Sequence, residues 1–185
     1  MKIAFIIFTG MTLLDFNGVY DPLTRLKSMG YIEDLTWDIC AYTDSVQDSF
    51  GLTLLPEKVK NDLSEYDVII IPGGMGTRTL MHDPDFIQWI QTGKDIPLKV
   101  SVCTGSLILG TAGFLEGTPA TSNPAAYELL APYCSEVIEE RIVDRGAIIT
   151  AGAVASSLDL GLYLVEKWEG PEAAKAIKEK MAYKN

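Results

Sequence analysis

Short apolar segments recur along the chain, and stretches with helical spacing separate them. The clearest is Val68–Ile71, which contains only β-branched residues and ends abruptly at Pro72. Residues 2–8 and Leu98–Val102 have a similar, largely apolar character. Strands that are apolar on both faces are typical of a parallel sheet covered by helices on both sides. We therefore predict an α/β fold, a three-layer sandwich with a mostly parallel central sheet and helices on both faces.

The predicted elements alternate in the order that such a sheet requires. We expect strands over residues 2–8, 35–43, 67–71 and 98–102. Residues 46–55 are expected to form a hairpin or an edge strand, and residues 142–150 a hairpin. Helices are expected over residues 15–27, 83–92, 104–112, 125–130, 154–167 and 171–182. This order gives right-handed βαβ units in a flavodoxin-like arrangement. No repeat or linker interrupts the chain, so we expect one domain over residues 1–185.

The charge and cysteine content of the chain argue against several kinds of partner. Its 15 Lys and Arg and 25 Asp and Glu residues give a formal net charge of −10, which repels nucleic-acid phosphates and anionic membrane surfaces. No apolar run approaches the roughly 20 residues that cross a bilayer, and we find no signal peptide. Cys40, Cys103 and Cys134 form no CxxC pair, which argues against a zinc site or a disulfide framework. We expect a cytoplasmic protein without metal or cofactor that binds neither nucleic acid nor membrane.

The most informative junction is centred on Cys103, where a predicted strand ends and a helix begins almost at once. Such an elbow needs small residues two positions before and after the nucleophile, and Ser101 and Gly105 occupy these positions. The N–H groups and partial positive charge of the helix start favour a thiolate and lower a cysteine pKa. For Cys40 and Cys134 we prefer a buried structural role. For Cys103 the elbow favours a reactive thiol.

Consecutive glycines follow another strand, in the segment Pro72-Gly73-Gly74-Met75-Gly76. Glycines let the backbone approach a ligand closely, and their N–H groups can form an anion-binding nest. A sharp turn leaving a buried strand explains the same pattern, and the phosphate-loop motif GxxxxGK[ST] is absent. Beside the Cys103 elbow, Gly73 and Gly74 become candidates for binding developing negative charge.

Asp15 lies between apolar residues close to the end of the first predicted strand. One interpretation is an N-cap for the helix that follows. The other is a carboxyl that faces the sulfur from an apolar pocket, with a raised pKa and the ability to donate or relay a proton. His82, the only histidine, precedes a helix and is expected to face solvent. A Cys–His–Asp triad is therefore poorly supported.

Together these junctions resemble the ThiJ/PfpI branch of the class I glutamine amidotransferase-like superfamily, and within it the chain looks most similar to the isonitrile hydratases. The resemblance covers nearly the whole chain. It is carried by residues 14–18, 68–76, 101–106, 115–121 and 127–130.

The resemblance implies a reaction and the residues that perform it. By motif, the catalytic residues are Cys103, Asp15 and Thr104, and the reaction adds water to the terminal carbon of an isocyanide to give an N-substituted formamide. The Cys103 thiolate would attack that carbon and Asp15 would supply a proton. Thr104 would orient the sulfur or Asp15, and the Gly74 and Thr104 N–H groups would face developing negative charge. Many superfamily members carry a histidine where this chain has Asn123. An amide can hydrogen-bond, so Asn123 is a candidate for binding the substrate or an oxyanion, but it cannot act as a base near neutral pH. This weakens the protease and amidotransferase interpretations.

Two other functions remain open. A glyoxalase or deglycase would use the same thiolate to attack an aldehyde, and a peroxide sensor would form a stabilised sulfenic or sulfinic acid at Cys103. The family resemblance also implies a homodimer that acts on a small-molecule substrate. The sequence has no C-terminal helix-turn-helix like that of related transcriptional regulators, which disfavours DNA binding.

Overall fold

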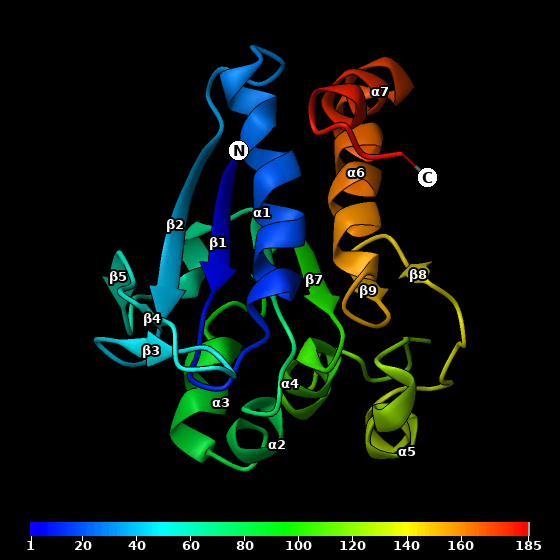
Figure 1. Cartoon of the computed structure of the whole chain (residues 1–185). Coiled ribbons are helices and arrows are strands. Elements are labelled where there is room, and N and C mark those ends of the chain that lie inside the picture. The colour runs from blue at the N-terminus through cyan, green and yellow to red at the C-terminus, as the bar shows by residue number, and fades with distance from the viewer. Residues whose placement is uncertain (185) are drawn as a thin grey trace.

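The computed structural model describes residues 1–184 and confirms the predicted α/β architecture (Figure 1). Over these residues the central sheet has seven strands in the order β5-β2-β1-β6-β7-β9-β8. Neighbouring strands are parallel except for the antiparallel pair β8 and β9. The strands are β1 (Lys2–Ile6), β2 (Thr36–Ala41), β5 (Lys58–Val59), β6 (Val68–Ile71), β7 (Leu98–Val102), β8 (Ile142–Asp144) and β9 (Ile148–Ala151).

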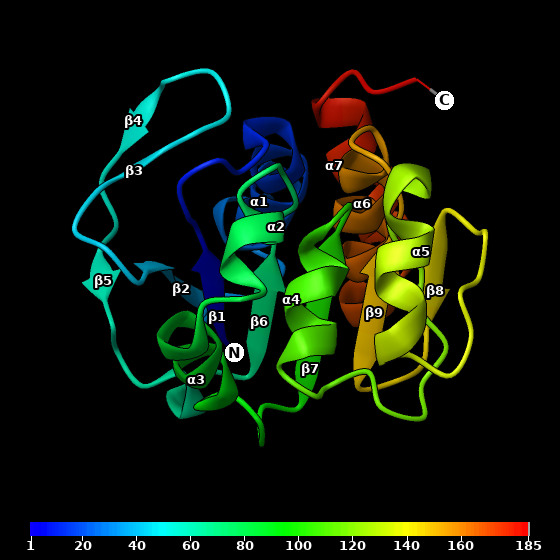
Figure 2. The same ribbon diagram turned by 90° about the horizontal axis from the view of Figure 1, so that it is seen from below.

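Helices cover both faces of the sheet and complete the three layers. Figure 2 shows α3, α4 and α5 in front of the sheet and α1, α6 and α7 behind it. The longer helices are α1 (Leu13–Ser28), α3 (Pro84–Gln91), α4 (Gly105–Thr111), α6 (Ser156–Glu169) and α7 (Pro171–Lys180). Single turns form α2 (Thr77–Leu80), α5 (Tyr127–Leu130) and the 3-10 segments Leu63–Glu65, Pro124–Ala126 and Ala131–Tyr133. Among the helices of residues 1–184, none combines the length and apolar content needed to span a bilayer.

The centre of the sheet is held by burial of apolar side chains. Strands β1, β6 and β7 lie side by side, with Phe5 opposite Ile70 and Ile70 opposite Val100. These three side chains are at most 2% exposed, and burying one of this size contributes about 1.5–3 kcal/mol. The parallel pairing brings the carboxyl ends of the strands to one edge of the sheet. The segments that follow β1, β6 and β7 therefore meet there.

Most sequence predictions hold, and the differences lie at element ends and in short elements. The expected hairpins form as β3 (Val46–Gln47) with β4 (Thr53–Leu54), and as β8 with β9. Asp83 caps α3 by accepting the Asp85 and Phe86 N–H groups. The strand predicted over residues 2–8 ends at Ile6. Two elements, α2 and β5, were not predicted from the sequence. Both missed elements are too short to show a hydrophobic period.

Helices α1 and α6 pack closely because small residues face each other. A Cβ added at Gly18 would lie 2.0 Å from Ser157 Oγ, and one at Gly161 would lie 2.8 Å from the Gly18 carbonyl oxygen. The Ser157 hydroxyl donates to carbonyl groups on both sides of the contact, those of Leu14 (3.1 Å) and Val154 (2.7 Å). This contact helps to fix α1, the helix that carries Asp15.

We expect Gly18→Ala to lower the free energy of unfolding by about 1–3 kcal/mol, because the added methyl group overpacks the helix contact. Adding Ser157→Gly removes the atoms that clash, so the double variant should be more stable than the sum of the single changes. Chemical denaturation measures both. Gly152→Ala is the matched control, since its Cβ would meet no atom closer than 3.6 Å. Equal losses in Gly18→Ala and Gly152→Ala would contradict the packing account.

Candidate active site

The backbone at Cys103 forms the predicted elbow between β7 and α4. Cys103 has a φ of 54°, a strained value for a residue with a side chain. Its N–H lies 2.9 Å from the Ala151 carbonyl oxygen and 2.8 Å from that of Gly152. Its carbonyl oxygen accepts the hydroxyls of Ser106 (3.2 Å) and Ser122 (3.0 Å). Hydrogen bonds to the end of β9, to α4 and to the segment before α5 therefore hold the elbow in its strained conformation.

Two glycines let the elbow approach the loop after β6. A Cβ at Gly105 would lie 2.2 Å from the Ile71 carbonyl oxygen. A Cβ at Gly73 would lie 2.6 Å from the Thr104 nitrogen and 2.7 Å from the Cys103 Cβ. Real Cβ atoms do not approach other atoms this closely, so the two segments can meet only with glycine at both positions.

Asp15 lies beneath this contact, inside the first turn of α1. Thr12 is the N-cap residue of that helix, so the capping interpretation of Asp15 is wrong. The Asp15 side chain is fully buried, and its Oδ2 accepts the Gly73 N–H at 2.9 Å. Within residues 1–184, its Oδ1 has no partner at hydrogen-bonding geometry. Burial raises the pKa of Asp15 to about 6, against smaller opposing effects of the Gly73 N–H and the neighbouring Cys103 thiol. The carboxyl therefore titrates near neutral pH beside the sulfur.

The side-chain amide of Asn123 also contacts the Cys103 sulfur. Its Nδ2 lies 3.4 Å from Cys103 Sγ, and its Oδ1 accepts the Ala125 N–H at 3.0 Å. Because that N–H can only donate, it fixes which end of the amide faces the sulfur. Asn123 thus offers the sulfur a hydrogen bond without a titratable proton.

The expectation of a lowered Cys103 pKa is wrong. Burial raises the pKa of the thiol, and the Asp15 charge raises it further. The Asn123 amide and the Thr104 N–H lower the pKa, but they do not overcome these effects. The side chain is only 4% exposed, and desolvation disfavours a thiolate. The elbow alone does not supply the charged nucleophile.

The glycine N–H groups are used inside the protein rather than turned toward a ligand. The Gly73 N–H donates to Asp15. The Gly74 N–H donates to Thr104 Oγ1 (3.0 Å), which also lies 3.0 Å from the Thr77 hydroxyl. The Thr104 hydroxyl therefore binds the glycine loop, not the sulfur or Asp15. Among the expected anion donors, only the Thr104 N–H faces the sulfur. Thr77, which is buried, was not predicted from the sequence. The only sequence feature that could have indicated its role is its position directly after Gly76.

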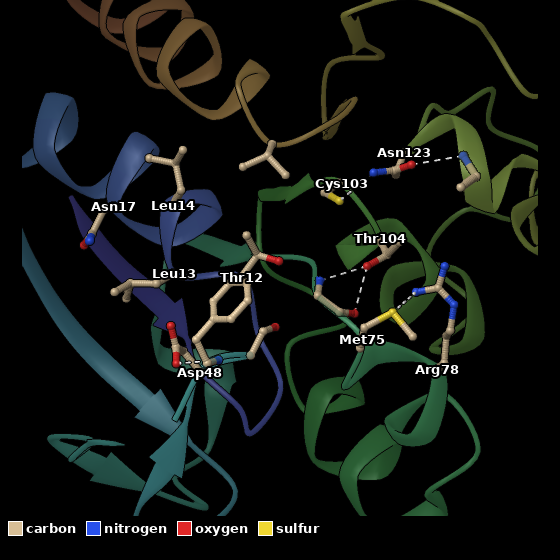
Figure 3. A pocket seen from close by; sticks show the side chains of 15 residues that line it. Thr12, Leu13, Leu14, Asn17, Asp48, Met75, Arg78, Cys103, Thr104 and Asn123 are labelled. Carbon is tan, nitrogen blue, oxygen red and sulfur yellow. Dashed lines mark hydrogen bonds between the residues drawn. The ribbon is translucent and has the colours of Figure 1, made fainter. Parts of the chain in front are cut away.

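A cavity of about 960 Å³ opens over the sulfur (Figure 3). Cys103, Thr104 and Asn123 line its reactive end. The rest of the wall is largely apolar, with contributions from Leu13, Leu14, Phe50, Met75 and Val154. A cavity of this kind can take a small organic molecule.

His82 is exposed, as expected, and does not line this cavity. Within residues 1–184, no three His, Cys, Asp or Glu side chains lie close enough together to hold a metal ion. The reactive end of the cavity offers the Cys103 thiol and the Asn123 amide, and the Asp15 carboxyl is buried beside the thiol.

Comparison with known proteins agrees with this geometry. The model of the DJ-1/PfpI family matches residues 1–167. The chain belongs to the DJ-1/PfpI family. This confirms the resemblance drawn from the Cys103 elbow and the glycine loop.

Individual members of the DJ-1/PfpI family differ in their named activities. Isonitrile hydratase of Pseudomonas putida is 32% identical over 99% of this chain and 78% of its own length. Glutathione-independent glyoxalase DJR-1.2 of Caenorhabditis elegans is 24% identical over 73% of the chain and 74% of its length. The transcriptional regulator GbdR of Pseudomonas aeruginosa is 25% identical over 98% of the chain, which spans 50% of that regulator. A ThiJ/PfpI family structure from Pseudomonas syringae superposes with a TM-score of 0.88, at 28% identity, over all of this chain and 75% of that one.

We expect two substitutions to move the Cys103 pKa in opposite directions. Asp15→Asn removes the negative charge that raises the pKa, so the pKa should fall. Asn123→Ala removes a hydrogen bond that lowers the pKa, so the pKa should rise. The rate of Cys103 alkylation by iodoacetamide against pH, resolved by peptide mass spectrometry, measures both.

Cys134 serves as the internal control, because it does not line the cavity and, within the described residues, its thiol donates to the backbone carbonyl groups of Leu130 and Glu136. Its alkylation profile should be the same in all three proteins. A rise of the Cys103 pKa in Asp15→Asn would overturn the electrostatic account of the site.

Proposed function

We propose that the protein hydrates small isonitriles to N-substituted formamides, with Cys103 as nucleophile and Asp15 as the group that moves the proton. The observation that carries the proposal is the buried Asp15 carboxyl, whose pKa is raised to about 6 beside the thiol. The 32% identity to an isonitrile hydratase supports it. The apolar cavity suits an isonitrile, which has no strong hydrogen-bonding groups of its own.

In the first step, Asp15 takes the thiol proton as the substrate binds. The Cys103 sulfur then forms a bond to the terminal carbon of the isonitrile, and the protonated Asp15 returns the proton to that carbon. The product is a thioimidate, in which a carbon–nitrogen double bond carries hydrogen and the sulfur. Asn123 and the Thr104 N–H stabilise the thiolate before attack.

In the second step, water adds across the carbon–nitrogen double bond. The oxygen bonds to carbon, one water proton goes to nitrogen, and the carbon–sulfur bond breaks as the carbonyl forms. The second water proton passes to Asp15, which shares it with the released Cys103 sulfur. The cycle consumes one water and leaves the enzyme unchanged, so it needs no metal or redox cofactor.

We expect wild-type protein to convert cyclohexyl isocyanide to N-cyclohexylformamide. Cys103→Ala should abolish turnover because no bond to sulfur can form. Asp15→Asn should lower kcat by about 10²–10⁴-fold, the usual contribution of a general acid–base group, while the Asn amide can still accept the Gly73 N–H. Chromatographic detection of the formamide measures the rates. No formamide from wild type, or an unchanged rate in Cys103→Ala, would refute this mechanism.

A second candidate function is glyoxalase chemistry, which the similarity to a nematode glyoxalase favours. There the Cys103 sulfur would attack the aldehyde of methylglyoxal. Consumption of methylglyoxal without activity on cyclohexyl isocyanide would replace the hydratase proposal. Selective oxidation of Cys103 at low peroxide, in a protein inert toward both compounds, would instead support a sensor.

We also propose a cytoplasmic homodimer that binds neither nucleic acid nor membrane. Support for the dimer comes from the hairpin of β3 and β4, where Phe50 is 92%, Leu55 74% and Leu52 54% exposed. A monomer rarely leaves such side chains together in solvent. Phe50 also lines the cavity, so a second copy covering it would narrow the entrance.

We expect light scattering on the eluting protein to give a mass near twice 20.2 kDa. Phe50→Ser should shift the protein toward monomer, because it removes apolar area from the proposed contact. Leu129→Ser, at an exposed residue of α5, is the matched control and should leave the mass unchanged. A monomeric wild-type protein would contradict the proposal.

A further inference from the structure

Arg78 is the only cationic side chain in the wall of the cavity within the described residues. It projects from α2, and Figure 3 shows its guanidinium on the same side of the cavity as Met75 and Thr104. The other charged group is Asp48, which Figure 3 shows on the opposite side. Asp48 Oδ1 already accepts the N–H groups of Phe50 (2.9 Å) and Leu52 (2.8 Å) and holds the hairpin turn.

The Arg78 guanidinium has no carboxylate partner among residues 1–184, although the chain has a formal net charge of −10. Among the described residues, its side-chain hydrogen bond is to the sulfur of Met75, at 3.5 Å. By contrast, Arg25 and Arg141 each bind an aspartate. A half-buried guanidinium keeps its charge and presents paired N–H donors that match a carboxylate.

We propose that Arg78 binds a carboxylate of the substrate and holds its electrophilic carbon over Cys103. A monoanion fits best because the cavity offers a single cation opposite Asp48, which would oppose a dianion such as a phosphate monoester. The natural substrate class is therefore small carboxylates with an electrophilic carbon. For the hydratase, these are isocyano carboxylates, a conclusion that rests on the proposed function.

The first experiment compares two alkylating reagents of similar size, the anion iodoacetate and the neutral iodoacetamide. With either reagent the Cys103 sulfur forms a bond to carbon as iodide leaves with the bonding pair. Peptide mass spectrometry follows Cys103 alone. The ratio of the two rates reports on charge recognition, because a change in the Cys103 pKa alters both rates equally and cancels.

Arg78→Gln should lower the iodoacetate-to-iodoacetamide ratio about tenfold, the usual effect of losing a hydrogen bond to a charged group. Arg78→Lys should retain part of the ratio, since it keeps the charge without the paired donors. Arg145→Gln is the matched control. Arg145 lies in the turn before β9, at the other end of the strand from the Cys103 contact, and it binds only backbone. Arg145→Gln changes the net charge by the same amount as Arg78→Gln. An equal ratio in wild type and Arg78→Gln overturns the inference.

The second experiment measures kcat/KM for isocyanoacetate and for its neutral methyl ester. Wild type should prefer the carboxylate, and Arg78→Gln should lower the carboxylate-to-ester ratio of kcat/KM about tenfold. If neither isocyanide is hydrated but the alkylation ratio still falls in Arg78→Gln, the hydratase proposal fails and carboxylate recognition stands. If the ester is hydrated and Arg78→Gln leaves the preference unchanged, Arg78 has no such role.

Discussion

The site depends on the close approach of two backbone segments, the Cys103 elbow and the glycine loop after β6. The distances from the virtual Cβ of Gly73 to the Thr104 nitrogen and the Cys103 Cβ, 2.6 and 2.7 Å, leave no room for a side chain. The same virtual Cβ lies 2.9 Å from Asp15 Oδ2. Because Gly73 has no side chain, the Cys103 thiol, the Asp15 carboxyl and the start of α4 can lie close together. The sheet supplies the frame, because the parallel strands β1, β6 and β7 end at one edge.

In this arrangement the N–H groups of the glycine loop bind side chains of the protein itself, not a ligand as the sequence suggested. Free N–H groups in a glycine turn are expected to bind an anion, yet here Gly73 and Gly74 donate to Asp15 and Thr104. The loop binds an internal carboxyl in place of an external one. The loop acts on the site through Asp15, whose position it fixes and whose pKa it lowers against the effect of burial.

Sequence patterns predicted the sheet, its long helices and the three elements that meet at the site. They succeeded because apolar runs such as Val68–Ile71 and the small residues around Cys103 have few alternative explanations. They predicted a lowered pKa for Cys103, whereas the pKa is raised in the structure. Helix starts are visible in sequence, but burial and the distance to Asp15 come from tertiary packing, and here these two effects dominate. The sequence indicated no role for Arg78 for a similar reason, because only the fold brings its side chain to the cavity wall.

The combination of Asp15 with Asn123 constrains the kind of reaction that suits this site. A histidine beside the sulfur would take a proton from the thiol and later protonate a leaving amine, as amide hydrolysis requires. Asn123 holds the sulfur but moves no proton. In the proposed mechanism, the proton that leaves the thiol and reaches the substrate carbon therefore passes through Asp15, which lies beneath the elbow. Hydration of an isonitrile needs one group that gives a proton to carbon and later regains one from water, and it expels no leaving group except the enzyme's own sulfur. A single buried carboxyl that titrates near neutral pH meets that requirement, and a Cys–His pair is unnecessary.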